Sequence, residues 1–169
     1  MSEIEFCKTC RKPKAPFVCG LCECHTCKSC AHFLGEDSFS YLRVIPQDLK
    51  HTIYCGQCFA EKISDTYNEY QDNLEKAKNI IIYSKDQSKL TRFLKRKQDP
   101  YVVENCEDEN EAIMRMSFFA VQENYNALID IVIKNKKIIV GSHKKTVYSG
   151  TAVPITIDPD SIRGHYEPP

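Results

Sequence analysis

The 169-residue chain has no tryptophan, no long apolar run and no excess of charge of one sign. Its 23 basic and 23 acidic side chains give a formal net charge of zero, which excludes a partner selected by bulk charge. The longest apolar runs, 80–83 and 118–121, are too short to cross a bilayer. The acidic start is followed by no apolar segment, so we expect no secretory signal and a cytoplasmic protein.

Motifs for common catalytic chemistry are also absent. The sequence contains no P-loop, no G-x-G-x-x-G, no G-x-S-x-G and no H-E-x-x-H. These absences remove the usual patterns for nucleotide binding, serine hydrolysis and zinc proteolysis. We therefore expect a protein that is not an enzyme.

Cysteine is the residue in unusual supply, because nine of the ten cysteines lie within the first 58 residues. Eight of them form four Cys-x2-Cys pairs, which are Cys7 with Cys10, Cys19 with Cys22, Cys27 with Cys30, and Cys55 with Cys58. In a reducing compartment this spacing indicates metal binding rather than disulfides. Two such pairs complete a tetrahedral zinc site, so four pairs predict two structural zinc ions with no open position for a catalytic water.

The spacing leaves the assignment of pairs to ions open. Because only four residues separate the second and third pairs, we favour an interleaved arrangement. It places one zinc on Cys7, Cys10, Cys27 and Cys30, and the other on Cys19, Cys22, Cys55 and Cys58. The alternative pairs them in sequence order, first with second and third with fourth. We expect His25, His32 and His51 to be polar surface side chains.

The order of the pairs resembles that of FYVE and FYVE-related zinc fingers over residues 6–60. The segment Thr52-Ile-Tyr-Cys-Gly-Gln-Cys-Phe59, which runs into a predicted helix, resembles the end of those domains. FYVE fingers carry a basic Arg-Arg-His-His-Cys-Arg stretch that binds phosphatidylinositol 3-phosphate. This chain has Cys24-His-Thr-Cys-Lys28 there, without the arginines that form charge-assisted forks on phosphate. Phosphoinositide binding at a membrane is therefore an alternative function.

Cys24 allows a second resemblance. If Cys22 and Cys24 are ligands and Cys19 is not, the spacing resembles a RING finger. A RING usually has a histidine in its central ligand set and often a proline inside its last pair. Here His25 is displaced by one position, and Cys55-Gly-Gln-Cys58 has no proline. This alternative implies a ubiquitin ligase finger.

The pattern changes after residue 60. Apolar residues at steps of three and four predict a linker helix over 61–78 that is packed on one side or paired as a short coiled coil; they are Phe59, Ile63, Tyr67, Tyr70 and Leu74. Residues 79–157 predict an element order of β-α-β-α-β-β. The fold class is therefore α+β, with a cross-brace double-zinc finger over 1–60, the linker helix, the second domain over 79–157 and a flexible tail over 158–169.

Local signals place the elements of the second domain. We expect strands at 80–83 and 101–104, and a helix between them that starts in a capping box of Ser84 and Gln87 and ends at Pro100. A second helix follows the acidic turn 107–109. Two strands, 127–140 and 144–157, flank a turn at Gly141, and Pro154 indicates an edge strand or a strand end.

The second domain resembles the small bacterial YbjQ-like family. The likeness rests on Asn126-Ala-Leu-Ile-Asp-Ile131 after a helix and on Thr146-Val-Tyr-Ser-Gly-Thr-Ala-Val-Pro-Ile155. It implies a compact α+β domain that assembles into homo-oligomeric rings. The family is described as heavy-metal-binding, but this half of the chain has only Cys106, His143 and His165 to offer, so we expect no metal site there.

Few other side chains suggest chemistry. We expect Cys106 to be a buried thiol that packs as a small hydrophobe rather than a nucleophile, and His143 to be exposed in a hairpin. The densest basic run is expected to be a solvated helix face, with a phosphate or nucleic-acid contact as the alternative; it comprises Lys89, Arg92, Lys95, Arg96 and Lys97.

These patterns favour a zinc-binding protein-interaction module on an oligomerising domain. The expected partners are another protein and further copies of this chain. Nucleic acid is not expected, because eight thiolates on two zinc ions add about four negative charges to the formal sum. The alternatives are a RING-type ubiquitin ligase and a phosphoinositide-binding finger.

A chelator should separate the two regions. Structural zinc contributes about 10–16 kcal/mol per site, whereas about 60 residues bury too little apolar surface to fold securely alone. We expect hydrogen exchange after chelation to report loss of protection over 6–60 and retained protection over 79–157. Simultaneous loss in both regions would contradict separate domains.

Overall fold

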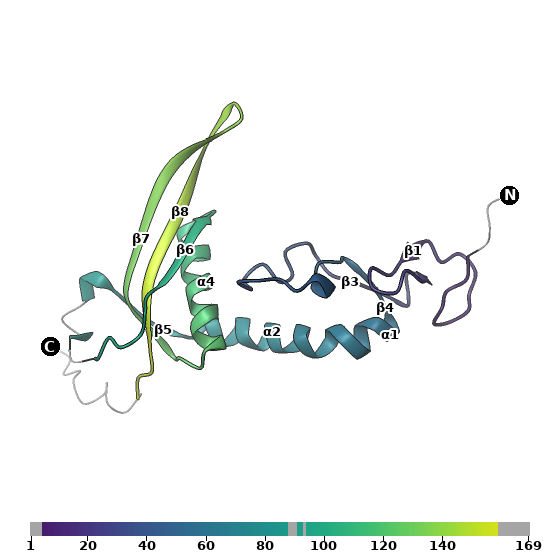
Figure 1. Ribbon diagram of the computed structural model, residues 1–169, viewed down its shortest axis with the longest axis horizontal. Coiled ribbons are helices and arrows are strands. Elements are labelled where there is room, and N and C mark those ends of the chain that lie inside the picture. The colour runs from purple at the N-terminus through teal and green to yellow at the C-terminus, as the bar shows by residue number, and fades with distance from the viewer. Residues whose placement is uncertain (1–4, 88–90, 93, 159–169) are drawn as a thin grey trace. The chain divides into compact units, whose positions relative to one another are not determined.

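The computed structural model describes residues 5–87, 91–92 and 94–158 (Figure 1). Helix and sheet are both well represented, which confirms the α+β fold class. The chain divides into two compact units, residues 1–72 and residues 73–169. The division falls inside a helix, so the first turns of the expected linker helix cluster with the cysteine-rich unit.

The cysteine-rich unit is built from two small antiparallel sheets and the start of that helix. Strand β1 (Phe17–Val18) pairs with β2 (His25–Thr26), and β3 (Ala31–Phe33) pairs with β4 (Ile53–Cys55). A short 3-10 helix, η1 (Gln47–Leu49), precedes β4. The chain then continues without a break through α1 (Gly56–Cys58), the π-helical turn η2 (Phe59–Ile63) and α2 (Ser64–Lys78).

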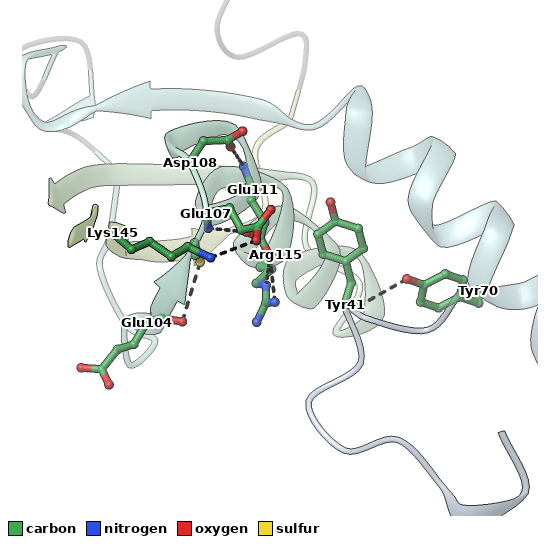
Figure 2. Close-up of polar contacts among 9 residues, drawn as sticks. Tyr41, Tyr70, Glu104, Glu107, Asp108, Glu111, Arg115 and Lys145 are labelled. Atoms are coloured by element: carbon green, nitrogen blue, oxygen red, sulfur yellow. Dashed lines mark hydrogen bonds and ion pairs between the residues drawn. The ribbon is translucent and has the colours of Figure 1, made fainter. Parts of the chain in front are cut away.

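The apolar seam of the helix packs against the long segment between the third and fourth cysteine pairs. Phe39 is 2% exposed and lies edge-on to Tyr67 and Tyr70, with ring centroids 6.1 and 5.1 Å away. The Tyr70 hydroxyl accepts a hydrogen bond from the Tyr41 backbone N–H at 3.3 Å (Figure 2). The apolar seam therefore packs against another segment of the same chain, as expected for a helix packed on one side.

Within the described residues, the second unit contains a four-stranded sheet with helix α4 against it. Its elements are β5 (Ile81–Ser84), the 3-10 helix η3 (Lys85–Gln87), β6 (Tyr101–Cys106), α4 (Glu109–Gln122), β7 (Ala127–Val140) and β8 (His143–Ile155). The strand order is β5-β7-β8-β6, with β5 parallel to β7 and the other neighbours antiparallel. Strand β7 has the predicted bounds, and Gly141, with φ +61°, forms the turn before β8.

Helix α4 begins at a cap that the acidic turn provides. The Asp108 carboxylate accepts a hydrogen bond from the Glu111 N–H at 2.7 Å, and the Glu111 carboxylate accepts from the Glu107 N–H at 2.5 Å (Figure 2). This reciprocal arrangement satisfies two backbone donors at the helix start. The helix buries Met116 close to the glycine of β8: a Cβ on Gly150 would lie 2.9 Å from the Met116 Cε atom.

Strand β8 bears out one of the two interpretations of Pro154, a strand end, and not the other, an edge strand. It is an internal strand between β7 and β6, so Pro154 does not mark an edge. Pro154 is instead the penultimate residue of the strand and lies beyond Ala152, the last residue of β8 that pairs with β6. A proline is tolerated at this position because no β6 residue there requires its missing N–H.

The helix expected to reach Pro100 is shorter than predicted. Gln87 accepts a hydrogen bond from the Ser84 N–H at 3.0 Å, as the capping box requires, but residues 94–100 are not helical. Leu90 and Phe93, which we expect to form the apolar side of this helix with Leu94, lie outside the described residues, as does Lys89. Residues 95–97 are therefore not part of one solvated helix face, and the exposed Arg96 makes specific contacts with the sheet.

Arg96 holds a bulge in the sheet. Its guanidinium donates to both carboxylate oxygens of Asp130, at 3.0 Å for the Nη2–Oδ1 contact, and to the Leu94 carbonyl at 3.1 Å. Asp130 has a φ of +53° and lies where β7 inserts one extra residue relative to both β5 and β8. The ion pair thus holds a non-glycine residue in the left-handed region, which costs free energy.

This ion pair should make the second unit sensitive to acid. The Arg96 guanidinium holds the pKa of Asp130 below its ordinary value of 3.8. A lowered folded pKa contributes stability that is present above the unfolded pKa and is lost as pH falls through the folded pKa. We expect the urea concentration at half-unfolding, followed by the NMR amide signals of β7, to decrease when the pH is lowered below about 4. This decrease should be smaller in Asp130→Asn. The control variant Asp99→Asn should lose as much stability in acid as the wild type. An equal loss in Asp130→Asn would contradict the assignment.

Candidate metal centres

The two small sheets bring the four Cys-x2-Cys pairs into position. The second pair lies in the loop between β1 and β2, and the third pair lies between β2 and β3. The fourth pair spans the end of β4 and α1, where the Cys55 sulfur accepts a hydrogen bond from the Cys58 N–H at 3.5 Å. Each pair therefore sits at a turn, where two sulfurs can point to the same side.

The first two pairs share one backbone conformation. Arg11 and Glu23, the residues directly after Cys10 and Cys22, have φ values of +59° and +57°. The N–H of each donates to the carbonyl of the first cysteine of its pair at 2.9 Å, Arg11 to Cys7 and Glu23 to Cys19. This turn folds each pair back on itself, as a two-sulfur metal loop requires.

The eight sulfurs gather in two groups of four. Cys7, Cys10, Cys27 and Cys30 form one group, and Cys19, Cys22, Cys55 and Cys58 form the other. Within each group all four sulfurs lie within 4.8 Å of one another. This is the grouping of the interleaved arrangement, first pair with third and second with fourth, and not that of sequential pairing.

Backbone hydrogen bonds support the interleaved grouping. The Lys8 N–H, inside the first pair, donates to the His25 carbonyl next to the third pair at 3.0 Å. The Gly20 N–H, inside the second pair, donates to the Ile53 carbonyl next to the fourth pair at 2.9 Å. A Cβ at Gly20 would lie only 2.3 Å from the His51 ring, so this approach requires glycine. The spacing of residues in the sequence does not predict this role of Gly20.

The sulfur geometry fits a tetrahedral ion. Four sulfurs at about 2.3 Å from a central zinc lie about 3.8 Å apart. The Cys10 and Cys27 sulfurs are 3.6 Å apart, and the Cys22 and Cys55 sulfurs are 3.7 Å apart. All-thiolate tetrahedral sets of this kind suit zinc, which would be closed to water and substrate.

The electrostatics of the groups also favour a cation. Hydrogen bonds from the backbone of Cys10 and Cys27 lower the pKa of Cys7 to about 5. Hydrogen bonds with the Cys27 and Cys10 sulfurs raise the pKa of Cys30 to about 12. The Cys7 thiolate therefore forms easily, whereas the neighbouring sulfurs oppose ionisation of Cys30. A divalent ion at the centre removes this opposition, because it is attracted to all four thiolates.

Cys24 lies outside both groups. Its sulfur donates to the Cys22 carbonyl at 3.4 Å, whereas Cys19 is fully buried within the second group. The ligand register that resembles a RING finger needs Cys24 in and Cys19 out. In the structure Cys19 belongs to the second group and Cys24 lies outside both groups.

The three histidines of this unit are not members of the groups. His32 is exposed, as expected, and stacks on Phe59 with ring centroids 4.1 Å apart. His25 and His51 are half-buried rather than fully exposed. His25 contacts the Ala15 carbonyl and forms an ion pair with Glu5, while His51 packs over Gly20. Spacing in the sequence could not reveal these contacts between distant segments.

The segment Cys24–Lys28 has little to offer a phosphate. The His25 ring is occupied by Glu5 and Ala15, and Thr26 is fully buried with its hydroxyl 3.9 Å from the Cys7 sulfur. Lys28 is the exposed cation of this segment. The segment therefore lacks a basic pocket like the one that the FYVE arginines form.

The remaining candidate residues lie in the second unit. Cys106 is fully buried, and burial raises the pKa of its thiol, as expected for a cysteine that packs as a small hydrophobe. His143 is exposed at the start of β8, as expected. His165 and the expected tail from residue 159 onward lie outside the described residues. Among the described helices, none is long and apolar enough to span a bilayer.

Comparisons with family models, with curated proteins and with solved structures found no match to this chain. They add no support to the FYVE or the YbjQ-like resemblance. The candidate site is therefore defined by the cysteine geometry and the backbone contacts that hold it.

Replacing one cysteine at a time should distinguish group members from bystanders. We expect Cys19→Ser to lose one of two bound metal equivalents in native mass spectrometry, because three thiolates hold zinc less tightly than four. The matched control, Cys24→Ser, should keep both. Metal loss in Cys24→Ser with retention in Cys19→Ser would overturn the grouping.

Proposed function

We propose that the first unit is a zinc-folded, non-catalytic module that binds another protein in a reducing compartment. The observation that carries the proposal is the pair of closed four-sulfur groups. Four thiolates fill the coordination sphere of zinc and leave no position for a water or a substrate. Zinc in such a site contributes to folding, so the module acts through the surface it presents.

The finger has an aromatic surface suited to a protein partner. Phe33 in β3 is 50% exposed and lies edge-on to Phe17 in β1, with ring centroids 5.0 Å apart. We call Phe17 and Phe33 the aromatic pair. Exposed aromatic side chains on a rigid support are frequent energetic centres of protein interfaces. A finger held by metal can leave such side chains exposed, because its fold does not depend on burying them.

We further propose that the second unit self-associates. Its sheet is open, with β5 and β6 as the outer strands. Each outer strand exposes an apolar side chain: Ile82 is 45% exposed and Val102 is 62% exposed. Open edges of this kind pair readily with another chain. Self-association would multiply the finger and raise its avidity for a repeated partner.

Substitution of the aromatic pair tests the interaction module. The zinc-loaded chain serves as bait in an extract of its source cells, and captured proteins are quantified by mass spectrometry. We expect Phe33→Ser to lose a defined set of partners by about tenfold or more, as for an interface centre. Val44→Ser, at an 81% exposed position in the same unit, should retain them.

Three outcomes would contradict the proposal. Equal capture by wild type and Phe33→Ser would remove the aromatic pair from the interface. Auto-ubiquitylation that is present in wild type and lost in Cys55→Ser would establish the RING-type alternative. A sedimentation mass equal to one chain at all concentrations would exclude self-association of the second unit.

A further inference from the structure

The hairpin of β7 and β8 extends beyond the rest of its sheet (Figure 1). Strand β5 pairs with β7 only as far as Ile131, and β6 pairs with β8 only as far as Tyr148. From Lys136 and Val147 to the turn, the described strands pair only with each other. We call residues 136–147 the hairpin arm.

The arm is basic although the whole chain is neutral. The sequence contains no aspartate or glutamate between Ile131 and Ile157, whereas five lysines lie in this stretch, at positions 134, 136, 137, 144 and 145. All five lysines are exposed. Lys145 contacts Glu107 at 3.1 Å, an exposed pair that contributes little and leaves the arm strongly positive (Figure 2).

The tip of the arm is apolar on both faces. Ile139 is 75% exposed and Val140 is 56% exposed. Consecutive residues of a strand point to opposite faces, so these two side chains emerge on opposite sides of the hairpin. Ile139 lies opposite Lys144, and Val140 lies opposite His143. Exposed aliphatic side chains therefore lie next to the turn, and lysines lie behind them on both faces of the hairpin.

This arrangement selects among anionic partners. A flat protein surface or a nucleic-acid groove that lay against one face of the hairpin would leave the aliphatic side chain of the other face in water. The arm also contains no arginine, phenylalanine, tyrosine or tryptophan, which are side chains that often read or stack on bases. A bilayer interface surrounds an inserted tip, so it can bury Ile139 and Val140 together while the lysines meet anionic headgroups.

We propose that the hairpin arm inserts its tip into the headgroup region of an anionic bilayer. A strand rises about 3.3 Å per residue, so Lys136, Lys137 and Lys145 follow the tip within about 15 Å, at the level of the lipid phosphates. The site lies in the second unit. It does not require the FYVE-like finger to bind a phosphoinositide, and it is independent of the aromatic pair.

Vesicle sedimentation with the full zinc-loaded chain tests the proposal. We expect binding to vesicles of phosphatidylcholine with phosphatidylserine and little binding to phosphatidylcholine alone. Lys137→Ala with Lys144→Ala should weaken binding about 25-fold, since each lysine near an anionic surface contributes about fivefold. Val140→Asn should weaken it about tenfold through loss of the inserted aliphatic side chain. All three positions are exposed, so these changes should leave the fold intact.

Matched controls use the same substitutions elsewhere. Val44→Asn and the double change Lys95→Ala with Lys97→Ala should bind as wild type. Equal binding to both vesicle types, or wild-type binding by Val140→Asn, would overturn the proposal. Tight binding to duplex DNA or RNA that Val140→Asn does not weaken would assign the arm to nucleic acid instead. An oligomer that dissociates in Val140→Asn without lipid would assign the tip to a second copy of the chain.

Discussion

The fold of the first unit depends on the meeting of eight cysteine sulfurs in two groups of four. The strands there are only two or three residues long. Tyr54 and Phe39 are among the few large side chains that are fully buried in it. Without a cation, thiolates that lie within 4.8 Å of one another would repel, as the raised pKa of Cys30 indicates. With zinc, each site would contribute about as much as the whole stability of a typical small domain.

The interleaving of the sites explains why such a short chain segment can hold its shape. Each group joins pairs that are not neighbours in the sequence, so neither site can form without ordering the loop that carries part of the other. The contacts of Lys8 with the third pair and of Gly20 with the fourth pair tie the same loops together through the backbone. The helix that follows the last cysteine then docks Tyr67 and Tyr70 on Phe39, which extends the unit to residue 72.

Local patterns predicted most of the fold but few of its long-range contacts. The β-rich stretch that ends at the Gly141 turn predicted the bounds of β7, and the acidic turn at 107–109 predicted the start of α4, because these signals act within a few residues. The helix before Pro100 was predicted too long, since Arg96 is drawn to Asp130, 34 positions away. His25 contacts the Ala15 carbonyl and His51 packs over Gly20, and spacing in the sequence cannot identify such contacts between distant segments. The net charge of the whole chain does not predict the basic arm, because a neutral sum hides a local stretch without acids.

X-ray absorption at the zinc edge of the full reduced chain tests the central claim most directly. The account predicts two zinc equivalents per chain, each surrounded by four sulfurs at about 2.3 Å with no nitrogen or oxygen ligand. A nitrogen or oxygen in the average coordination shell, or fewer than two equivalents of metal in carefully reduced protein, would contradict it.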